Sequence, residues 1–260
     1  AASDTIETSR LMIPAFSLTL LSLLKPPELI PAVESGDAAF MRLDYPAAIL
    51  VYDSLQTIMP NNAETLWRLA RVHVCLGDIT PRDQREPLYR KAEAYARRAI
   101  QVDSVNGFGY TWLAAALGNI AMYEGSKTKI KLSHEIKEKL DRAIALNRGD
   151  DIAYSILGSF YRALGNISWI EKQFANIFLG SLPDGGYEEA ETTLKEAIRL
   201  APNIIRHQHE LGMLYFDMDR EEDALQEFRE AVHLPVTLAS DRRRIERMKE
   251  RLAELGESDH

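Results

Sequence analysis

Cysteine is almost missing from this chain of 260 residues, whose one thiol is Cys75. A single cysteine excludes an internal disulfide and any zinc site built on several cysteines, so we expect Cys75 to pack as a small apolar residue. Positive charge is the minority sign, with 31 Lys and Arg against 39 Asp and Glu, which gives a net charge of −8. That balance argues against nucleic acid as the main partner, because phosphate backbones attract cations.

Motifs for catalysis and metal binding are also missing. The chain contains no glycine-rich phosphate loop, no nucleophile elbow, no HExxH and no cysteine–histidine pair with ligand spacing. His207 and His209 are two residues apart, so on a helix their side chains point away from each other and cannot hold one ion. We therefore predict a protein that is not an enzyme and has no catalytic residues, no metal site and no cofactor.

The longest apolar run that we consider is too short for a transmembrane helix. The run LMIPAFSLTLLSLL at residues 11–24 has 14 residues, too few to span a bilayer comfortably. Three interpretations remain open for the segment 1–28 that contains it. It is a packing or docking segment that covers the first repeat, the apolar region of an export signal whose start is lost, or the product of signal cleavage at Ala1. We favour a docking segment on an exported protein, and the cell envelope or periplasm over the cytoplasm.

What the chain does have is a repeat. A short helical motif followed by residues that end a helix, such as Met59-Pro60 or Leu234-Pro235, occurs five times. We mark each copy by one equivalent position, and these anchor positions are Leu55, Ala99, Ala143, Ala197 and Ala231. The anchors are 44, 44, 54 and 34 residues apart, which is a unit of about 34 residues with insertions. This is the tetratricopeptide period, in which each unit is a helical hairpin.

The last unit shows how its two helices pack. It carries a small-large alternation typical of this repeat, at Leu211, Gly212, Tyr215, Ala224, Phe228, Ala231 and Pro235. A small residue in one helix admits a bulky one from its neighbour. We therefore expect Gly158 and Gly212 to lie where the helices of a hairpin approach most closely.

These signals predict an all-α fold. It is a right-handed tetratricopeptide-repeat superhelix of about five helical hairpins at residues 29–237, with an inserted helix in the fourth unit and a C-terminal capping helix and tail at 238–260. The apolar stripe of residues 167–179 predicts the inserted helix. The other helices are expected at about 31–42, 46–58, 63–76, 86–102, 107–122, 129–146, 151–164, 187–200, 204–217, 221–233 and 238–255.

Several longer sequence motifs indicate which family of repeat proteins the chain resembles. In order along the chain they are Leu66-Trp67-Arg68-Leu69-Ala70-Arg71, Tyr89-Arg90-Lys91-Ala92, Ala143-Ile144-Ala145-Leu146-Asn147, Ser168-Trp169-Ile170-Glu171-Lys172 and Tyr187-Glu188-Glu189-Ala190. This order closely resembles the regulator of microtubule dynamics family between about Glu64 and Pro235.

The resemblance implies a helical-repeat domain that is not an enzyme. Animal members of the family include a mitochondrial outer-membrane tether at contacts with the endoplasmic reticulum, and binding and transfer of phospholipid has been proposed for the repeat domain of that tether. Bacteria carry relatives, and this acidic, linker-poor chain looks like one of them. Because it lacks the long animal N-terminal region, we do not carry the tethering role over to it.

The repeat phase also predicts a binding groove. In such superhelices the first helix of each hairpin lines the concave face. The predicted groove residues are Trp67, Arg71, Phe108, Thr111, Ser155, Ser159, Arg162, Arg206, His209, Met213 and Phe216, with Ile170, Phe174 and Ile177 of the inserted helix as a wall. Alternatively, the apolar members are core and the arginines pair with acids of the protein itself, such as Glu64, Asp217 or Asp219.

Two functions compete for this groove. The first is an interaction scaffold that holds a protein or peptide partner, which is the usual use of such repeats. The second, which the family resemblance favours, is binding or transfer of a phospholipid, a fatty acyl chain or another small apolar ligand in an internal cavity. Arginines beside apolar residues suit either an acyl ligand with an anionic head or a peptide with an acidic terminus.

Overall fold

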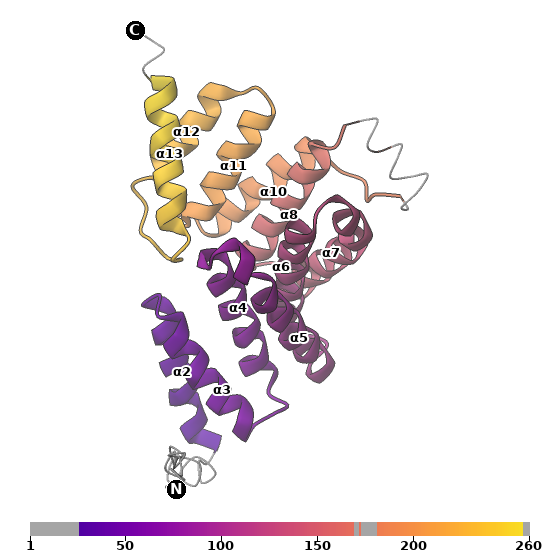
Figure 1. Cartoon of the computed structure of the whole chain (residues 1–260), viewed down its shortest axis with the longest axis vertical. Coiled ribbons are helices and arrows are strands. Elements are labelled where there is room, and N and C mark those ends of the chain that lie inside the picture. The colour runs from indigo at the N-terminus through magenta and orange to yellow at the C-terminus, as the bar shows by residue number, and fades with distance from the viewer. Residues whose placement is uncertain (1–25, 169–171, 173–180, 257–260) are drawn as a thin grey trace, which may run out of the picture.

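The computed structural model describes residues 26–168, 172 and 181–256, and all regular structure within them is helical. Ten of these helices pack as five consecutive hairpins, shown from indigo to orange in Figure 1. The pairs are α2 (Pro26–Met41) with α3 (Tyr45–Ile58), α4 (Ala63–Ile79) with α5 (Glu86–Val102), α6 (Gly107–Glu124) with α7 (Ser126–Leu146), α8 (Asp151–Gly165) with α10 (Tyr187–Leu200), and α11 (Ile205–Asp217) with α12 (Glu221–Ala231).

A last helix, α13 (Asp241–Gly256), packs on α11 and α12. Its Met248 is fully buried, so it covers the apolar side of the final hairpin, as a terminal cap of a repeat array must. The predicted all-α superhelix of five hairpins with a C-terminal cap is therefore confirmed. None of the described helices has both the length and the apolar character needed to cross a bilayer.

Polar residues at the turns set where the helices begin. The side chains of Asp44, Asn62, Asn106 and Asp150 each accept a hydrogen bond from the backbone N–H three residues further on. Such caps satisfy one of the backbone donors that the first turn of a helix leaves free. Helix α2 begins at Pro26, earlier than expected, because the Pro26-Pro27 pair suits the first turn of a helix.

Two glycines confirm the expected repeat phase. A Cβ atom on Gly158 would overlap the side chain of Leu194, and one on Gly212 would lie 2.5 Å from a ring carbon of Phe228. Both contacts join the two helices of one hairpin. The close approach of helices at these positions follows from the small-large alternation of the repeat.

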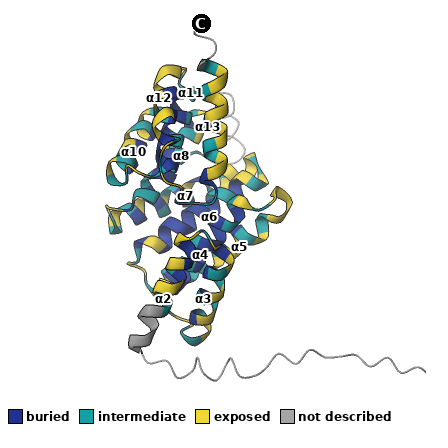
Figure 2. Ribbon diagram, turned by 90° about the vertical axis from the view of Figure 1, so that its left-hand side faces the viewer, coloured by how far each residue is buried: buried dark blue, intermediate teal, exposed yellow. Residues whose placement is uncertain are grey.

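Burial is greatest along the first helices of the second and third hairpins, α4 and α6. Helices α4 and α6 are largely dark blue in Figure 2, and one core cluster runs from the first hairpin to α8. The predicted inserted helix at 167–179 and the segment before Pro26 lie outside the described residues, apart from residues 167, 168 and 172.

The two ends of the array touch. We call residues 236–244, which comprise the end of the loop before α13 and the first turn of α13, the clasp. Its Ala239 N–H donates to the hydroxyl of Tyr45 at 3.0 Å, across 194 residues of sequence, and its Arg243 donates to the carbonyl oxygen of Asp78 at 2.7 Å. Figure 1 shows this end of α13 beside the end of α4. The superhelix is therefore closed by the C-terminal cap, which the sequence pattern did not predict.

Candidate binding surface on the inner helices

The first helices of successive hairpins form one continuous row. Helix α4 contacts α6, α6 contacts α8, and α8 contacts α11. The predicted groove residues all lie on these helices. The structure therefore places them on one row of helices, where several of them are buried.

An aromatic pair lies at the α4–α6 contact. The rings of Trp67 and Phe108 have centroids 4.8 Å apart, and the indole N–H of Trp67 donates to Glu64 at 3.1 Å. Trp67 is 6% exposed, whereas Phe108 is 38% exposed. Phe108 is therefore the member of the pair that a ligand can contact.

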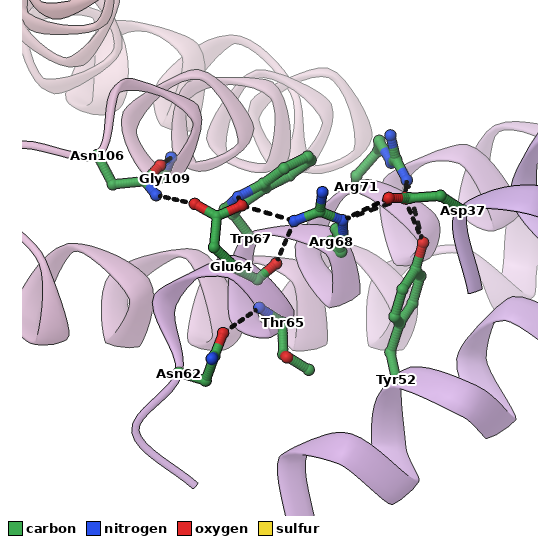
Figure 3. Close-up of polar contacts among 10 residues, drawn as sticks. All are labelled: Asp37, Tyr52, Asn62, Glu64, Thr65, Trp67, Arg68, Arg71, Asn106 and Gly109. Carbon is green, nitrogen blue, oxygen red and sulfur yellow. Dashed lines mark hydrogen bonds and ion pairs between the residues drawn. The ribbon is translucent and has the colours of Figure 1, made fainter. Parts of the chain in front are cut away.

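Arg71 belongs to a first polar cluster, drawn in Figure 3, that joins the first two hairpins. The carboxylate of Asp37 accepts hydrogen bonds from Arg68 at 2.9 Å, from Arg71 at 2.7 Å and from the hydroxyl of Tyr52 at 2.7 Å. Burial would raise the pKa of Asp37, but the hydrogen bond from Tyr52 and the charges of the two arginines lower it. The cluster holds the hairpins together, so Arg71 is largely committed to the protein.

The guanidinium of Arg71 is also stacked. It lies 3.8 Å from the ring centroid of Phe40 and 5.2 Å from that of Trp67. Cation–π contacts of this kind hold the side chain in one orientation.

A second polar cluster joins α8 to α11. The hydroxyl of Ser159 donates to Glu210 at 3.1 Å, and Arg162 lies 3.6 Å from the carboxylate of Asp217. Burial would raise the pKa of Glu210, but the hydrogen bond with His209 and the charges of Arg162 and Arg206 lower it strongly. The cluster therefore holds an ionised carboxylate beside two guanidinium groups.

Donor atoms in the second cluster lack acceptors. Ser155 Oγ, Arg162 Nη1 and Arg206 Nε are buried and have no hydrogen-bond partner in the described structure. Buried donors of this kind are rare because each unmade bond costs about 1 to 3 kcal/mol. Ser155 is fully buried, whereas the side chains of Arg162 and Arg206 are partly exposed, so the two arginines are the candidates for contact with an acceptor group of a partner.

The other predicted groove residues are more enclosed. Thr111 is fully buried, and its hydroxyl donates to Asp150 at 2.6 Å, so it supports the start of α8 and does not face an open groove. Met213 and Phe216 are partly buried against Phe228 and its neighbours. Ile170, Phe174 and Ile177 lie outside the described residues.

Neither of two surface hollows is lined by a predicted groove residue. One, of about 160 Å³, is lined by residues that include Leu164, Lys172 and Pro183, and an open one of about 480 Å³ is lined by Arg82, Asp83 and Tyr123. Within the described part of the chain, no group of three His, Cys, Asp or Glu side chains is placed to hold a metal ion.

The acidic members of both clusters were missed from the sequence, apart from Glu64 and Asp217, which were named as alternative partners of the arginines. Glu210 follows Arg206 by four residues, which places both side chains on one face of a helix and was a usable signal. Asp37 precedes Arg71 by 34 residues. That separation is one repeat period, but only the packed hairpins show that the two side chains meet.

Stacked helical hairpins with these caps and close helix contacts define a tetratricopeptide-type helical-repeat protein. The crystal structure of a thermophilic TPR protein from Thermus thermophilus has the same fold, with a TM-score of 0.65 and 20% identity over 86% of this chain and 98% of that one. The chain belongs to the family of regulator of microtubule dynamics proteins 1-3, whose model matches residues 34–256. The predicted family is thereby confirmed.

Curated relatives share part of their length with this chain. Regulator of microtubule dynamics protein 2 of Homo sapiens is 28% identical over 181 residues, which cover 69% of this chain and 44% of that protein. Regulator of microtubule dynamics protein 1 of Bos taurus is 30% identical over 145 residues, which cover 55% of this chain and 46% of that protein. The chain thus spans less than half the length of these relatives.

Proposed function

We propose that this protein is a binding scaffold, not an enzyme, and that it holds a segment of a protein partner on its inner helices. The observation that carries the proposal is the pair of guanidinium donors, Arg162 Nη1 and Arg206 Nε, that lack acceptors in the described structure on two partly exposed side chains. An acidic side chain or a chain-terminal carboxylate of the partner would supply those acceptors. The half-exposed Phe108 offers an apolar contact further along the same row.

Charge balance favours a singly charged group over a phosphate. Arg162 and Arg206 carry two positive charges, and the nearby Glu210 and Asp217 carry two negative ones. A dianion would be repelled by both carboxylates, whereas one carboxylate can bind both guanidinium groups at a smaller electrostatic cost.

Binding of short synthetic peptides tests the proposal. We expect acidic peptides to bind better than neutral or basic ones of equal length. Replacing Arg162 and Arg206 together by Ala should lower the affinity for acidic peptides by about tenfold to hundredfold, because charge-assisted hydrogen bonds are lost.

Two exposed arginines on outer helices provide the matched control. Arg142→Ala with Arg229→Ala removes the same charge from α7 and α12 and should leave peptide affinity unchanged. Equal losses in both double variants would show that net charge, and not this surface, determines binding.

The alternative predicted from the sequence, an elongated apolar cavity for a lipid, stays a prediction. A fluorescent acyl lipid titrated in parallel tests it directly. Saturable lipid binding that is stronger than peptide binding would favour a lipid carrier. Of the two surface hollows, the one near Lys172, of about 160 Å³, is smaller than the ligand sites of about 300 to 1,000 Å³ that usually hold such molecules. The open one, of about 480 Å³, is large enough but is lined by Arg82, Asp83 and Tyr123, none of which is a predicted groove residue.

A further inference from the structure

The clasp packs on the apolar end of the first two hairpins. Leu238 and Ala239 are partly buried against the core cluster that contains Phe40, Tyr45 and Cys75. Tyr45 is 1% exposed, and its ring stacks on that of Phe40 at 5.3 Å. The clasp therefore covers apolar surface that would otherwise face solvent.

The clasp is a preformed turn. Asp241, which is fully buried, accepts hydrogen bonds from the N–H of Leu238 at 2.8 Å and from the N–H of Thr237 at 3.1 Å. Arg244 pairs with the same carboxylate at 3.0 Å. Because these bonds lie within the clasp itself, the turn can keep its shape when its contacts with the first hairpins are broken.

Few polar bonds hold the clasp to the first hairpins. They are the bond from Ala239 to Tyr45 and the bond from Arg243 to the carbonyl oxygen of Asp78, at the last turn of α4. A cation at a helix C-terminus is favoured by the helix dipole. Arg206 and Arg244 also act on the carboxylate of Asp78: burial raises its pKa, and these two charges oppose the rise. This places Arg206 of the proposed binding surface within electrostatic reach of both Glu210 and the clasp contact.

We infer that the clasp is a reversible closure of the superhelix, and that its release from Tyr45 and Asp78 opens the concave face to the partner. The inference rests on the proposed function only in its second half, which identifies the concave face as the partner's site. Release breaks two hydrogen bonds and exposes a small apolar area, while α13 keeps its own contacts through Met248.

Cys75 reports the opening without any ligand. It is the one cysteine of the chain, it is 5% exposed, and it belongs to the cluster on which the clasp packs. Burial raises the pKa of its thiol to about 12, so the closed form reacts very slowly with a disulfide reagent such as dithiobis(nitrobenzoate). The labelling rate of the whole chain therefore measures how often the surface is uncovered.

The test compares a double variant, which carries both Tyr45→Phe and Arg243→Ala, with the parent chain. Tyr45→Phe keeps the ring and removes the acceptor of Ala239, and Arg243→Ala removes the bond to Asp78. We expect labelling of Cys75 to become about tenfold faster, as two modest hydrogen bonds imply. Arg242→Ala, at an exposed neighbouring position, is the matched control and should label at the parent rate.

A variant that is destabilised far from the clasp distinguishes clasp opening from global unfolding as the cause of Cys75 labelling. Gly158→Ala disturbs the α8–α10 contact, far from the clasp in sequence. If it speeds labelling as much as the double variant at equal loss of stability, Cys75 is exposed by unfolding and the clasp does not open. Labelling of the double variant at the parent rate would also overturn the inference.

The claim that clasp release opens the concave face is tested by the association rate of the acidic peptide that binds with the highest affinity. We expect the double variant to bind it faster than the parent chain, and equal rates would show that the clasp does not control access. If no peptide binds any variant, the proposed function fails, while the labelling rates still decide whether the clasp opens.

Discussion

Glycine at a helix contact is the residue-scale feature with the clearest energetic consequence. A Cβ atom on Gly212 would lie 2.5 Å from Phe228 and 3.2 Å from the backbone oxygen of Ala224, whereas one on Gly118 has nothing within 4 Å. The same substitution therefore has opposite effects at two helical positions. Packing determines the first case and backbone entropy the second.

We expect Gly212→Ala to lower the free energy of unfolding by about 1 to 3 kcal/mol, because the fully packed Phe228 ring has to move. Gly118→Ala should raise it by about 0.5 to 1 kcal/mol, because alanine restricts the unfolded chain more than glycine does. Urea denaturation measures both. Equal effects of the two substitutions would mean that the α11–α12 contact is looser than the structure shows.

Glu227 on α12 gives the protein a pH-dependent term. Burial and the neighbouring charge of Glu230 raise the pKa of Glu227 from 4.5 to about 7. The folded chain therefore keeps this proton to a higher pH than the unfolded chain does. The stability that the protonated group contributes is present below about pH 4.5 and is lost as the pH rises through about 7.

Glu227→Gln removes this loss. The variant should be more stable than the parent by about 1 to 2 kcal/mol at about pH 8 and equal to it at about pH 4. Thermal unfolding at both pH values measures the difference, with the exposed Glu250→Gln as a control that should show little change. A variant that is no more stable than the parent at the higher pH would show that Glu227 ionises normally.

At the scale of elements, the start of α8 links two hairpins. Asp150 accepts from the N–H of Ala153 at 3.0 Å, within its own helix, and from the hydroxyl of Thr111 on α6 at 2.6 Å. Burial raises the pKa of Asp150, although the hydrogen bonds from Thr111 and Ala153 oppose the rise. One side chain thus caps a helix and joins it to the previous unit.

Thr111→Val should cost about 1 to 2 kcal/mol of stability, because Asp150 loses a partner while the volume is kept. Asp150→Ala should cost about 2 kcal/mol, and the double variant less than the sum of the two, since the shared bond is counted once. Peptide affinity should remain at the parent value in Thr111→Val. A selective loss of affinity would return Thr111 to the groove that the repeat phase predicted.

Element positions could be predicted from the sequence because their signals are local. Turn and cap residues such as Asn62, Asn106 and Asp150 mark the starts, and the alanine anchors give the phase. Contacts between charged residues of different hairpins, such as Asp37 with Arg71 or Ser159 with Glu210, depend on the superhelical path and leave no local pattern. The groove therefore stays a prediction, and the repeat phase alone could not show which arginine pairs with which acid.

For the whole molecule, the contact between the first and last units changes how stability is shared. In an open array each repeat contacts only its neighbours, so a weakened unit affects mainly the adjacent ones. Here the clasp joins the last unit to Tyr45 in the first. Damage to the first hairpin should consequently be felt at the other end of the chain.

Gly36→Ala tests this coupling. A Cβ atom at Gly36 would overlap the ring of Tyr52 and weaken the α2–α3 hairpin. We expect hydrogen exchange at the Ala239 amide to become faster, since its acceptor is Tyr45, while the amides in the middle of α10 should change much less. Exchange that stays slow at Ala239 would mean that the ends of the array are energetically independent.

The clasp also has a consequence for the way the protein is made. Tyr45 leaves the ribosome long before Ala239, which lies 194 residues later. At about 5 to 20 residues per second, that interval lasts about 10 to 40 seconds. Throughout it the ring of Tyr45, at the start of α3, is not yet covered by the clasp, and the same holds for Cys75 once α4 has been made. A partner that meets the nascent chain therefore encounters this surface before the protein's own C-terminal segment does.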